Sequence, residues 1–114
     1  MILILSSFVA SSPVGGSAQA AALAGLEIES VLAPTVLFGR HPGLGPPGGG
    51  PVDAAMFQGV LAGIEANGVF PGVEAVIAGY FAHADQVAAA ARTIDAVKAA
   101  RPGALIVVDP IMGD

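Results

Sequence analysis

Residues 105–114 read LIVVDPIMGD, and this stretch decides how the rest of the chain is interpreted. The apolar, β-branched run that ends at Val108 predicts a buried strand over residues 104–108. Asp109 follows it directly, and Pro110 ends the strand because proline cannot donate to a strand ladder. Open α/β sheets bind their ligands beyond the carboxyl ends of the strands. The stretch therefore predicts an α/β fold with carboxylates at its ligand-binding edge, namely Asp109 and, five residues later, Asp114.

The composition is that of one packed domain. The chain has 114 residues, of which 54% are hydrophobic and only 11% are charged, so a disordered chain is excluded. So few charges on a small domain indicate that part of its surface is normally covered. The net charge is −5, with four Lys and Arg residues in all, which argues against nucleic acid as a partner. Because there is no cysteine, disulfides, thiolate metal ligands and cysteine nucleophiles are excluded.

The amino terminus bears on where the protein is found. No run of the chain reaches the roughly 18 apolar residues of a membrane span, so we expect no membrane partner. Residues 1–10 are mostly apolar and residues 18–20 resemble a signal-peptide cleavage site. Since no Lys or Arg precedes the apolar run, a cleaved signal peptide is the weaker alternative. We expect a cytoplasmic protein.

Upstream of the opening stretch, the chain contains three further apolar runs. They predict strands over residues 2–5, 28–38 and 74–78, the second with Pro34 at a bulge, near its end or on an edge. Residues 39–51 are rich in Gly and Pro and predict a long loop, of the kind that covers or binds ligands. They exclude a helix or a central strand there.

Three segments between these strands have helical spacing. A helix is expected over residues 17–26, a second from a cap at Asp53 to a stop at Gly68, and a third from a cap at Asp85 to a stop at Pro102. Strands that alternate with helices predict a mostly parallel sheet, covered on both faces and joined by right-handed crossovers. The expected apolar faces of the three helices contain Ala20, Leu23 and Ala24; Phe57, Val60, Leu61 and Ile64; and Val87, Ala91, Ile94 and Val97 or Lys98.

Parallel strands place all their carboxyl ends at one edge of the sheet. That edge would carry Ser7, residues 35–38, Tyr80 and Asp109, beside the Gly-rich loop. A hydroxyl, a phenol and a carboxylate that converge next to such a loop predict a pocket for a small molecule. Pro110 and Gly113 form a turn that could aim the Asp109 and Asp114 carboxylates at a magnesium ion on phosphates.

Each of these residues also has a plainer interpretation. Ser7 could cap a turn, Tyr80 could lie on the rim with a solvated hydroxyl, and His41 could be a solvated loop residue. Asp109 and Asp114 could be ordinary turn residues. The residues alone leave these alternatives open.

Four motifs carry a resemblance to a known family. They are LSSFV at 5–9 with VGGSA at 14–18, PTVLFGRHPG at 34–43, AGY at 78–80 and VDPIMGD at 108–114. In this order and spacing they resemble the pyridoxal kinases of the ribokinase-like superfamily, and they span the whole chain. The resemblance implies a three-layer α/β/α fold with a mostly parallel sheet. It also implies a homodimer that transfers the γ-phosphoryl group of ATP to the 5′-hydroxyl of pyridoxal, with Mg2+, in vitamin B6 salvage.

The resemblance assigns roles to particular residues. The Ser7 hydroxyl would hydrogen-bond the pyridine ring of the substrate, and Asp109 and Asp114 would lie on the side of ATP and the metal. The residues expected to wall or stack on the ring are Val14, Val36, Phe38 and Tyr80, and those expected to cover it are His41, Pro42 and Gly43.

Three positions depart from the family pattern. Phe8 stands where the family has histidine, residues 40–42 read Arg-His-Pro in place of Asn-His-Thr, and residues 15–16 read Gly-Gly in place of Gly-Asn. The second change removes a hydroxyl often used on the substrate. These departures bear on the affinity for the substrate and on its choice more than on the fold.

Family members continue for well over a hundred further residues. Residues 1–114 would then be the N-terminal part of one ribokinase-like domain, without the Gly-Thr-Gly-Asp-like anion hole or the catalytic aspartate. We therefore expect the isolated chain to have no kinase activity. Two alternatives remain: part of a hydroxymethylpyrimidine kinase, whose first loop more often reads Ser-Asp-Ser-Ser-Gly-Gly-Ala-Gly, and a non-catalytic α/β binding module.

Overall fold

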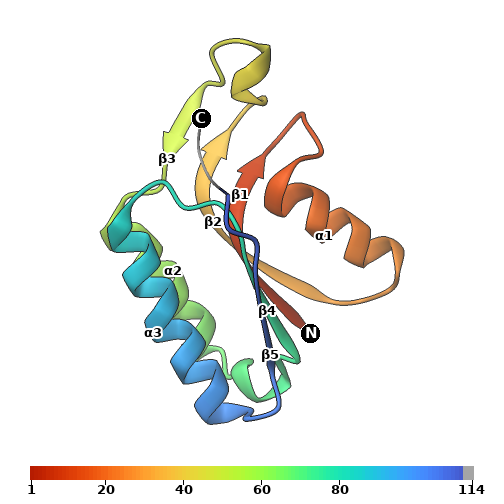
Figure 1. The fold of residues 1–114 in the computed structure, drawn as a ribbon, viewed down its shortest axis with the longest axis vertical. Helices are drawn as coiled ribbons and strands as arrows, with labels where there is room; N and C mark the ends of the chain where they lie inside the picture. Colours follow the sequence, from red (N-terminus) through yellow and green to blue (C-terminus); the bar gives the residue numbers. More distant parts are fainter. Residues whose placement is uncertain (112–114) are drawn as a thin grey trace.

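The computed structural model describes residues 1–111 as a five-stranded sheet between two layers of helices (Figure 1). Strands β1, β2, β4 and β5 are parallel, and β3 pairs antiparallel to β2. The predicted three-layer α/β/α fold with a mostly parallel sheet is confirmed. The elements in chain order are β1 (Ile2–Val9), α1 (Gly15–Gly25), β2 (Ser30–Phe38), the 3-10 helix η1 (Pro42–Leu44), β3 (Gly49–Pro51), α2 (Ala54–Ala66), the 3-10 helix η2 (Phe70–Gly72), β4 (Ala75–Ala78), α3 (Ala84–Ala100) and β5 (Leu105–Val108).

The strand order β3-β2-β1-β4-β5 makes β1 the centre of the sheet. After β1 the chain passes through α1 on one face to β2, and later elements return through α2 and α3 on the other face to β4 and β5 (Figure 1). The winding direction therefore reverses beside β1. Such a reversal leaves a crevice outside the carboxyl ends of the strands, where doubly wound sheets bind ligands.

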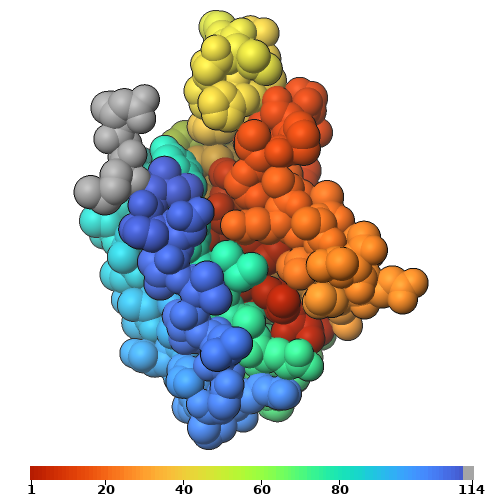
Figure 2. Space-filling view, turned by 45° about the vertical axis from the view of Figure 1, so that its right-hand side comes forward, coloured from red at the N-terminus to blue at the C-terminus, as the bar shows by residue number. Residues whose placement is uncertain are grey.

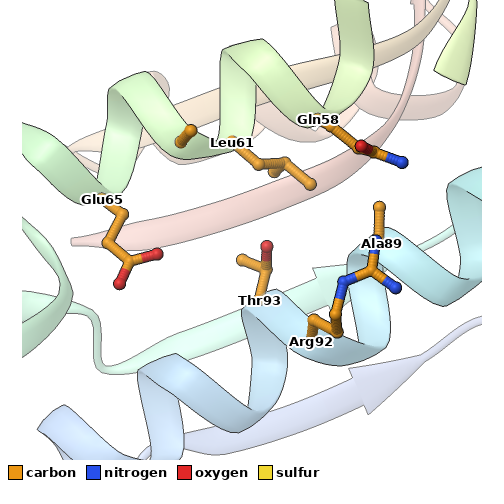
Figure 3. A pocket seen from close by; sticks show the side chains of 7 residues that line it. Gln58, Leu61, Glu65, Ala89, Arg92 and Thr93 are labelled. Atoms are coloured by element: carbon orange, nitrogen blue, oxygen red, sulfur yellow. The ribbon is translucent and has the colours of Figure 1, made fainter. Parts of the chain in front are cut away.

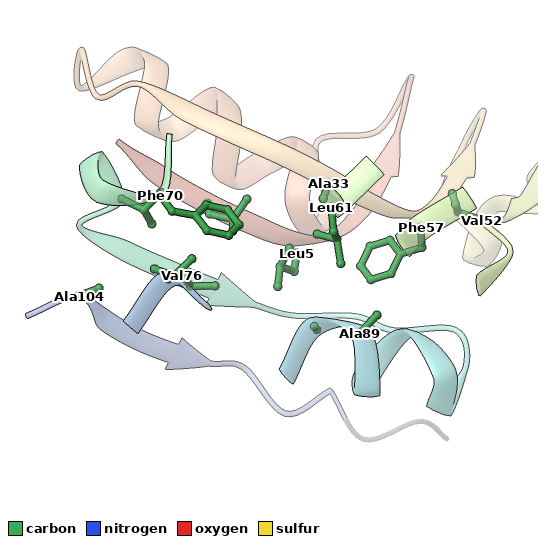
Figure 4. Close-up of a cluster of buried hydrophobic side chains, with 13 residues drawn as sticks. Leu5, Ala33, Val52, Phe57, Leu61, Phe70, Val76, Ala89 and Ala104 are labelled. Carbon is green, nitrogen blue, oxygen red and sulfur yellow. The ribbon is translucent and has the colours of Figure 1, made fainter. Parts of the chain in front are cut away.

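The main hydrophobic core lies between the sheet and the pair α2 and α3 (Figure 4). Leu5 of β1, Ala33 of β2 and Val76 of β4 face Phe57 and Leu61 of α2 across it, and all five are buried. Phe57 and Leu61 belong to the face predicted for the second helix. That helix begins at Asp53, whose Oδ1 accepts the Met56 N–H at 2.8 Å, and ends before Gly68 at a φ of 71°. Both predicted ends are confirmed.

The opposite face of the sheet is covered by α1, which packs on β1 and β2. In Figure 2, α1 lies in orange to one side, while β5, in blue, runs along the near surface. Leu105, Val107 and Val108 are 68%, 48% and 61% exposed. The prediction that this strand is buried is therefore wrong, because β5 is the edge of the sheet and α1 packs on β1 and β2 instead.

Several local predictions need correction. Residues 49–51 form the edge strand β3 inside the segment predicted to be loop throughout, because their backbone pairs with residues 36–38 far away in sequence. In the third helix the N-cap position is held by His83, whose side chain makes no capping hydrogen bond, and the predicted cap Asp85 lies in the first turn. Its buried face contains Gln86, Ala89, Ala90, Thr93 and Val97, whereas the predicted Val87 and Ala91 are exposed. Val97 and Ile94 of the predicted face do pack in the core, so the prediction is confirmed for the second half of the helix and wrong for the first. The four alanines at 88–91 give no hydrophobic contrast from which the buried face there could be identified.

Pro34 precedes a bulge, as one of the interpretations predicted. Ser6 pairs with Pro34 and Phe8 pairs with Leu37, so Thr35 and Val36 together lie opposite Ser7. A bulge re-aims side chains and is common beside binding sites.

None of the helices within residues 1–111 is long and apolar enough to cross a lipid bilayer.

Candidate functional site

A cavity of about 320 Å³ opens at the carboxyl ends of β1, β2 and β4. This is the crevice where the direction of winding reverses. Its size is at the lower end of the range of small-molecule sites. It is lined by Ser7, Val9, Val14, Gly15, Val36, Phe38, His41, Pro42, Tyr80 and Ile111.

The floor of the cavity is formed by β1. Ser7 is only 9% exposed, and none of the hydrogen bonds found within residues 1–111 uses its hydroxyl. Gly15 lies directly against it at a φ of 55°, and a Cβ there would overlap the Ser7 Oγ. Glycine is required at this position both for its backbone conformation and for space. Ser7 is thus a largely buried residue that lines the cavity, and its hydroxyl has its hydrogen-bonding capacity available.

The first turn of α1 holds the end of β1 in place. The Ser17 Oγ accepts the Val9 N–H at 2.7 Å. The Ala10 and Ser11 N–H groups donate to the Phe38 and Gly39 carbonyls at 2.8 and 3.0 Å. The ends of β1 and β2 therefore stay side by side beyond the regular ladder, and Val14 and Phe38 face the same cavity.

The bulged part of β2 and the residue after β4 form the opposite wall. Val36 is buried and lines the cavity, and Tyr80 lines it while 38% exposed. The Thr35 hydroxyl donates to the Tyr80 carbonyl at 2.6 Å. The Tyr80 N–H donates to the Ser6 Oγ at 3.2 Å. The backbone of the only tyrosine in the chain is thus fixed on both sides, and its ring is left at the mouth of the cavity.

The segment from Gly39 to Leu44 covers one side. The His41 N–H donates to the Ser12 Oγ at 3.3 Å, and the His41 Nδ1 accepts the Gly43 N–H at 2.9 Å. Because Nδ1 is an acceptor, the neutral ring carries its proton on Nε2, which is then a donor. His41 and Pro42 line the cavity, whereas Gly43 is not among the lining residues and contributes only the N–H that bonds to the His41 ring.

Seven of the eight residues predicted to bind the substrate therefore line one cavity, although they come from four separate segments. Most of the described lining residues have apolar side chains, and three of them, Ser7, His41 and Tyr80, have polar side-chain groups. Such a lining suits a flat ring with a few polar substituents. The role of these residues in binding stays a prediction.

The two predicted carboxylates are placed differently. Asp109 is exposed beyond β5, with its N–H bonded to the Ala78 carbonyl at 2.8 Å, and it does not line the cavity. Asp114 lies outside the described residues. Within residues 1–111 no three His, Cys, Asp or Glu side chains gather as a metal site would require. Mg2+ on a nucleotide needs only one or two carboxylates, since phosphates and water supply its other ligands. The role of Asp109 as a metal ligand stays a prediction.

A second hollow of about 300 Å³ lies on the outer side of the molecule between α2 and α3 (Figure 3). Gln58, Leu61 and Glu65 of α2 face Arg92 and Thr93 of α3 across it. It shares no lining residue with the cavity at the carboxyl edge of the sheet, and no motif of the sequence contributes to it.

Three lining residues were missed from the sequence. Val9 at the end of β1 and Ile111, three residues beyond the end of β5, are apolar residues that only the folded arrangement brings to the cavity. Gly15 is different, because it belongs to one of the four motifs of the sequence, VGGSA at 14–18. Its contact with the Ser7 hydroxyl could have been inferred from the Gly that the family has at this position.

Comparisons with other proteins agree with this geometry. The pyridoxal kinase PdxY of Deinococcus radiodurans is 36% identical over 113 residues, which is 99% of this chain and 38% of that protein. The solved pyridoxal kinase of Leishmania donovani in complex with ADP has a TM-score of 0.91 at 27% identity, over 99% of this chain and 40% of that one. The pyridoxal kinase of Entamoeba histolytica with PLP has a TM-score of 0.84 at 30% identity, over 99% and 41%.

No family model matches the chain. The chain spans between 34% and 40% of the length of the first curated relatives that it matches. Within that span, the resemblance to pyridoxal kinases is confirmed, and so is the ribokinase-like fold that it implied.

Proposed function

We propose that this chain is the vitamer-binding, N-terminal part of a pyridoxal kinase. In that role it holds pyridoxal while the γ-phosphoryl group of ATP passes to the 5′-hydroxyl, giving pyridoxal 5′-phosphate for vitamin B6 salvage. The observation that carries the proposal is the single cavity lined by seven residues of the predicted set, at the reversal point of the sheet. The names of the relatives support the same reaction.

The lining of the cavity suggests how a pyridine ring would be held. Val14, Val36 and Phe38 would contact the faces and edges of the ring, and Tyr80 would close the mouth. The Ser7 hydroxyl and the His41 Nε2–H would pair with polar ring atoms, because a buried polar atom without a partner costs about 1–3 kcal/mol. Pro42 and Gly43 would shape the covering segment.

In this proposal ATP and Mg2+ bind beside the vitamer cavity, at the segment that follows β5. Asp109 and Asp114 would hold or orient the metal, whose charge offsets that of the phosphates during transfer. Among the described residues, none of those that line the cavity is a carboxylate. We propose that the group which removes the proton of the substrate hydroxyl lies in the part of the enzyme that this chain does not span, and that the isolated 114 residues bind without transferring phosphate.

The proposal includes two further points that rest on the resemblance alone. The complete enzyme would be a homodimer and would act in the cytoplasm.

Titration calorimetry of the chain tests the proposal. Pyridoxine is the probe because it lacks the aldehyde that would react with lysine, and hydroxymethylpyrimidine is the competitor. We expect saturable binding of pyridoxine that is tighter than that of the pyrimidine, and no ATP-dependent phosphorylation in a coupled assay. Tighter binding of the pyrimidine would indicate the other kinase, and binding of neither would favour a non-catalytic module.

A further inference from the structure

Gln86, in the first turn of α3, is a fully buried polar side chain that does not line the cavity. Its amide makes three hydrogen bonds to the main chain. Nε2 donates to the Thr35 carbonyl at 2.9 Å and to the Val52 carbonyl at 2.7 Å, and Oε1 accepts the Ala82 N–H at 2.8 Å. Two carbonyls and one N–H as partners leave one possible orientation of the amide.

The three partners belong to three different segments. Thr35 lies in the bulge of β2, Val52 joins β3 to α2, and Ala82 joins β4 to α3. The Thr35 carbonyl also accepts the Val52 N–H at 2.9 Å, so the bulge and the end of β3 meet at the same point. One side chain therefore connects the segments that surround the carboxyl edge of the sheet.

Through Thr35, the hydrogen bonds of Gln86 also link to two residues that line the cavity, Val36 and Tyr80. Val36 is the residue after Thr35 within the bulge, and Tyr80 is tied to the Thr35 hydroxyl at 2.6 Å. If the Gln86 amide were lost, the Val52 carbonyl and the Ala82 N–H would lose these partners in a buried site. The bulge would then be free to relax, and Val36 and Tyr80 would move with it.

We propose that Gln86 is a positioning residue for the vitamer site, which fixes the separation of Val36 and Tyr80 without touching the ligand. The inference rests on the proposed function for the identity of the ligand. Its plain alternative is a local helix cap, in which only the bond to the Ala82 N–H matters. A cap would affect the stability of α3 and leave the cavity unchanged.

The chain offers a direct spectroscopic probe, because Tyr80 is its only tyrosine and it has no tryptophan. The near-ultraviolet circular dichroism of tyrosine therefore reports on one wall of the cavity. The test variant is Gln86→Met, which keeps the length of the side chain and removes its polar atoms. The control is Thr93→Val on the same buried face of α3, where the side chain lines the hollow toward α2 (Figure 3).

For Gln86→Met we expect a weaker Tyr80 signal and a roughly tenfold loss of pyridoxine affinity, from one buried pair left unsatisfied. Thr93→Val should change neither, whatever its effect on stability. An unchanged Tyr80 signal in folded Gln86→Met would overturn the proposal, as would an equal loss of affinity in Thr93→Val. If the chain itself binds no pyridoxine, the proposed function fails, and the Tyr80 signal still decides the role of Gln86.

A second pair of variants serves if Gln86→Met does not fold. Thr35→Val removes the hydroxyl that holds the Tyr80 carbonyl, and Thr35→Ser retains it. We expect the first to reduce the Tyr80 signal and the pyridoxine affinity several-fold, and the second to restore both. Equal signals in the two variants would contradict the connection from Gln86 to Tyr80.

Discussion

Strands β1 and β5 are parallel members of one sheet, and each delivers a predicted site residue at its carboxyl end, yet their surroundings are opposite. Leu3, Ile4 and Leu5 of β1 are completely buried, because helices cover both faces and strands pair on both sides. In β5 only Ile106 is even half-buried. The difference teaches that the Ser7 side of the site is built within this chain, whereas the Asp109 side is not enclosed by the described residues.

The largest expected contrast is in stability. Leu5→Ala should lower the free energy of unfolding by about 2–5 kcal/mol, since it leaves a cavity in the core. Val107→Ala on β5 should cost less than about 1 kcal/mol, because that side chain is half exposed and leaves little empty space. Urea unfolding measures both. Equal losses would show that β5 is as well packed in solution as β1.

A smaller effect is expected where β1 meets α1. Gly15→Ala should cost about 1–3 kcal/mol through its positive φ, and its Cβ would displace the Ser7 hydroxyl and weaken pyridoxine binding. Gly59→Ala is the matched control, because that position is an exposed helical site with nothing near a new Cβ. It should stabilise α2 by about 0.5–1 kcal/mol. Thermal unfolding measures the stability of the two variants, and calorimetry measures their affinity for pyridoxine. A pyridoxine affinity equal to wild type in Gly15→Ala would refute the proposed effect of the Gly15 contact with the Ser7 hydroxyl.

The smallest expected effect distinguishes the predicted vitamer site at Ser7 from the predicted ATP and metal site at Asp109. Ser7→Ala should weaken pyridoxine binding by about 1 kcal/mol, the typical net value of one hydrogen bond. Asp109→Asn should leave that affinity unchanged, because Asp109 does not line the cavity. A loss of pyridoxine affinity in Asp109→Asn would mean that the end of β5 reaches the vitamer after all.

Much of this arrangement could be predicted from the sequence, for identifiable reasons. The apolar runs and caps indicate the parallel strands and α2, and a parallel sheet necessarily brings Ser7, Val36 and Tyr80 to one edge. The strand β3 could not be predicted, because its backbone pairs with β2 across a long Gly- and Pro-rich segment. Gln86 was missed because helical patterns assign polar residues to solvent, and only the packed structure shows that its partners are main-chain groups.

The central claim is that the vitamer side of the site is already formed in this chain, and amide chemical shifts test it most directly. Pyridoxine should shift the N–H signals of Ser7, His41 and Tyr80, and leave those of residues 105–108 and of the hollow between α2 and α3 in place. Shifts confined to that hollow, or no shifts at saturating pyridoxine, would contradict the account.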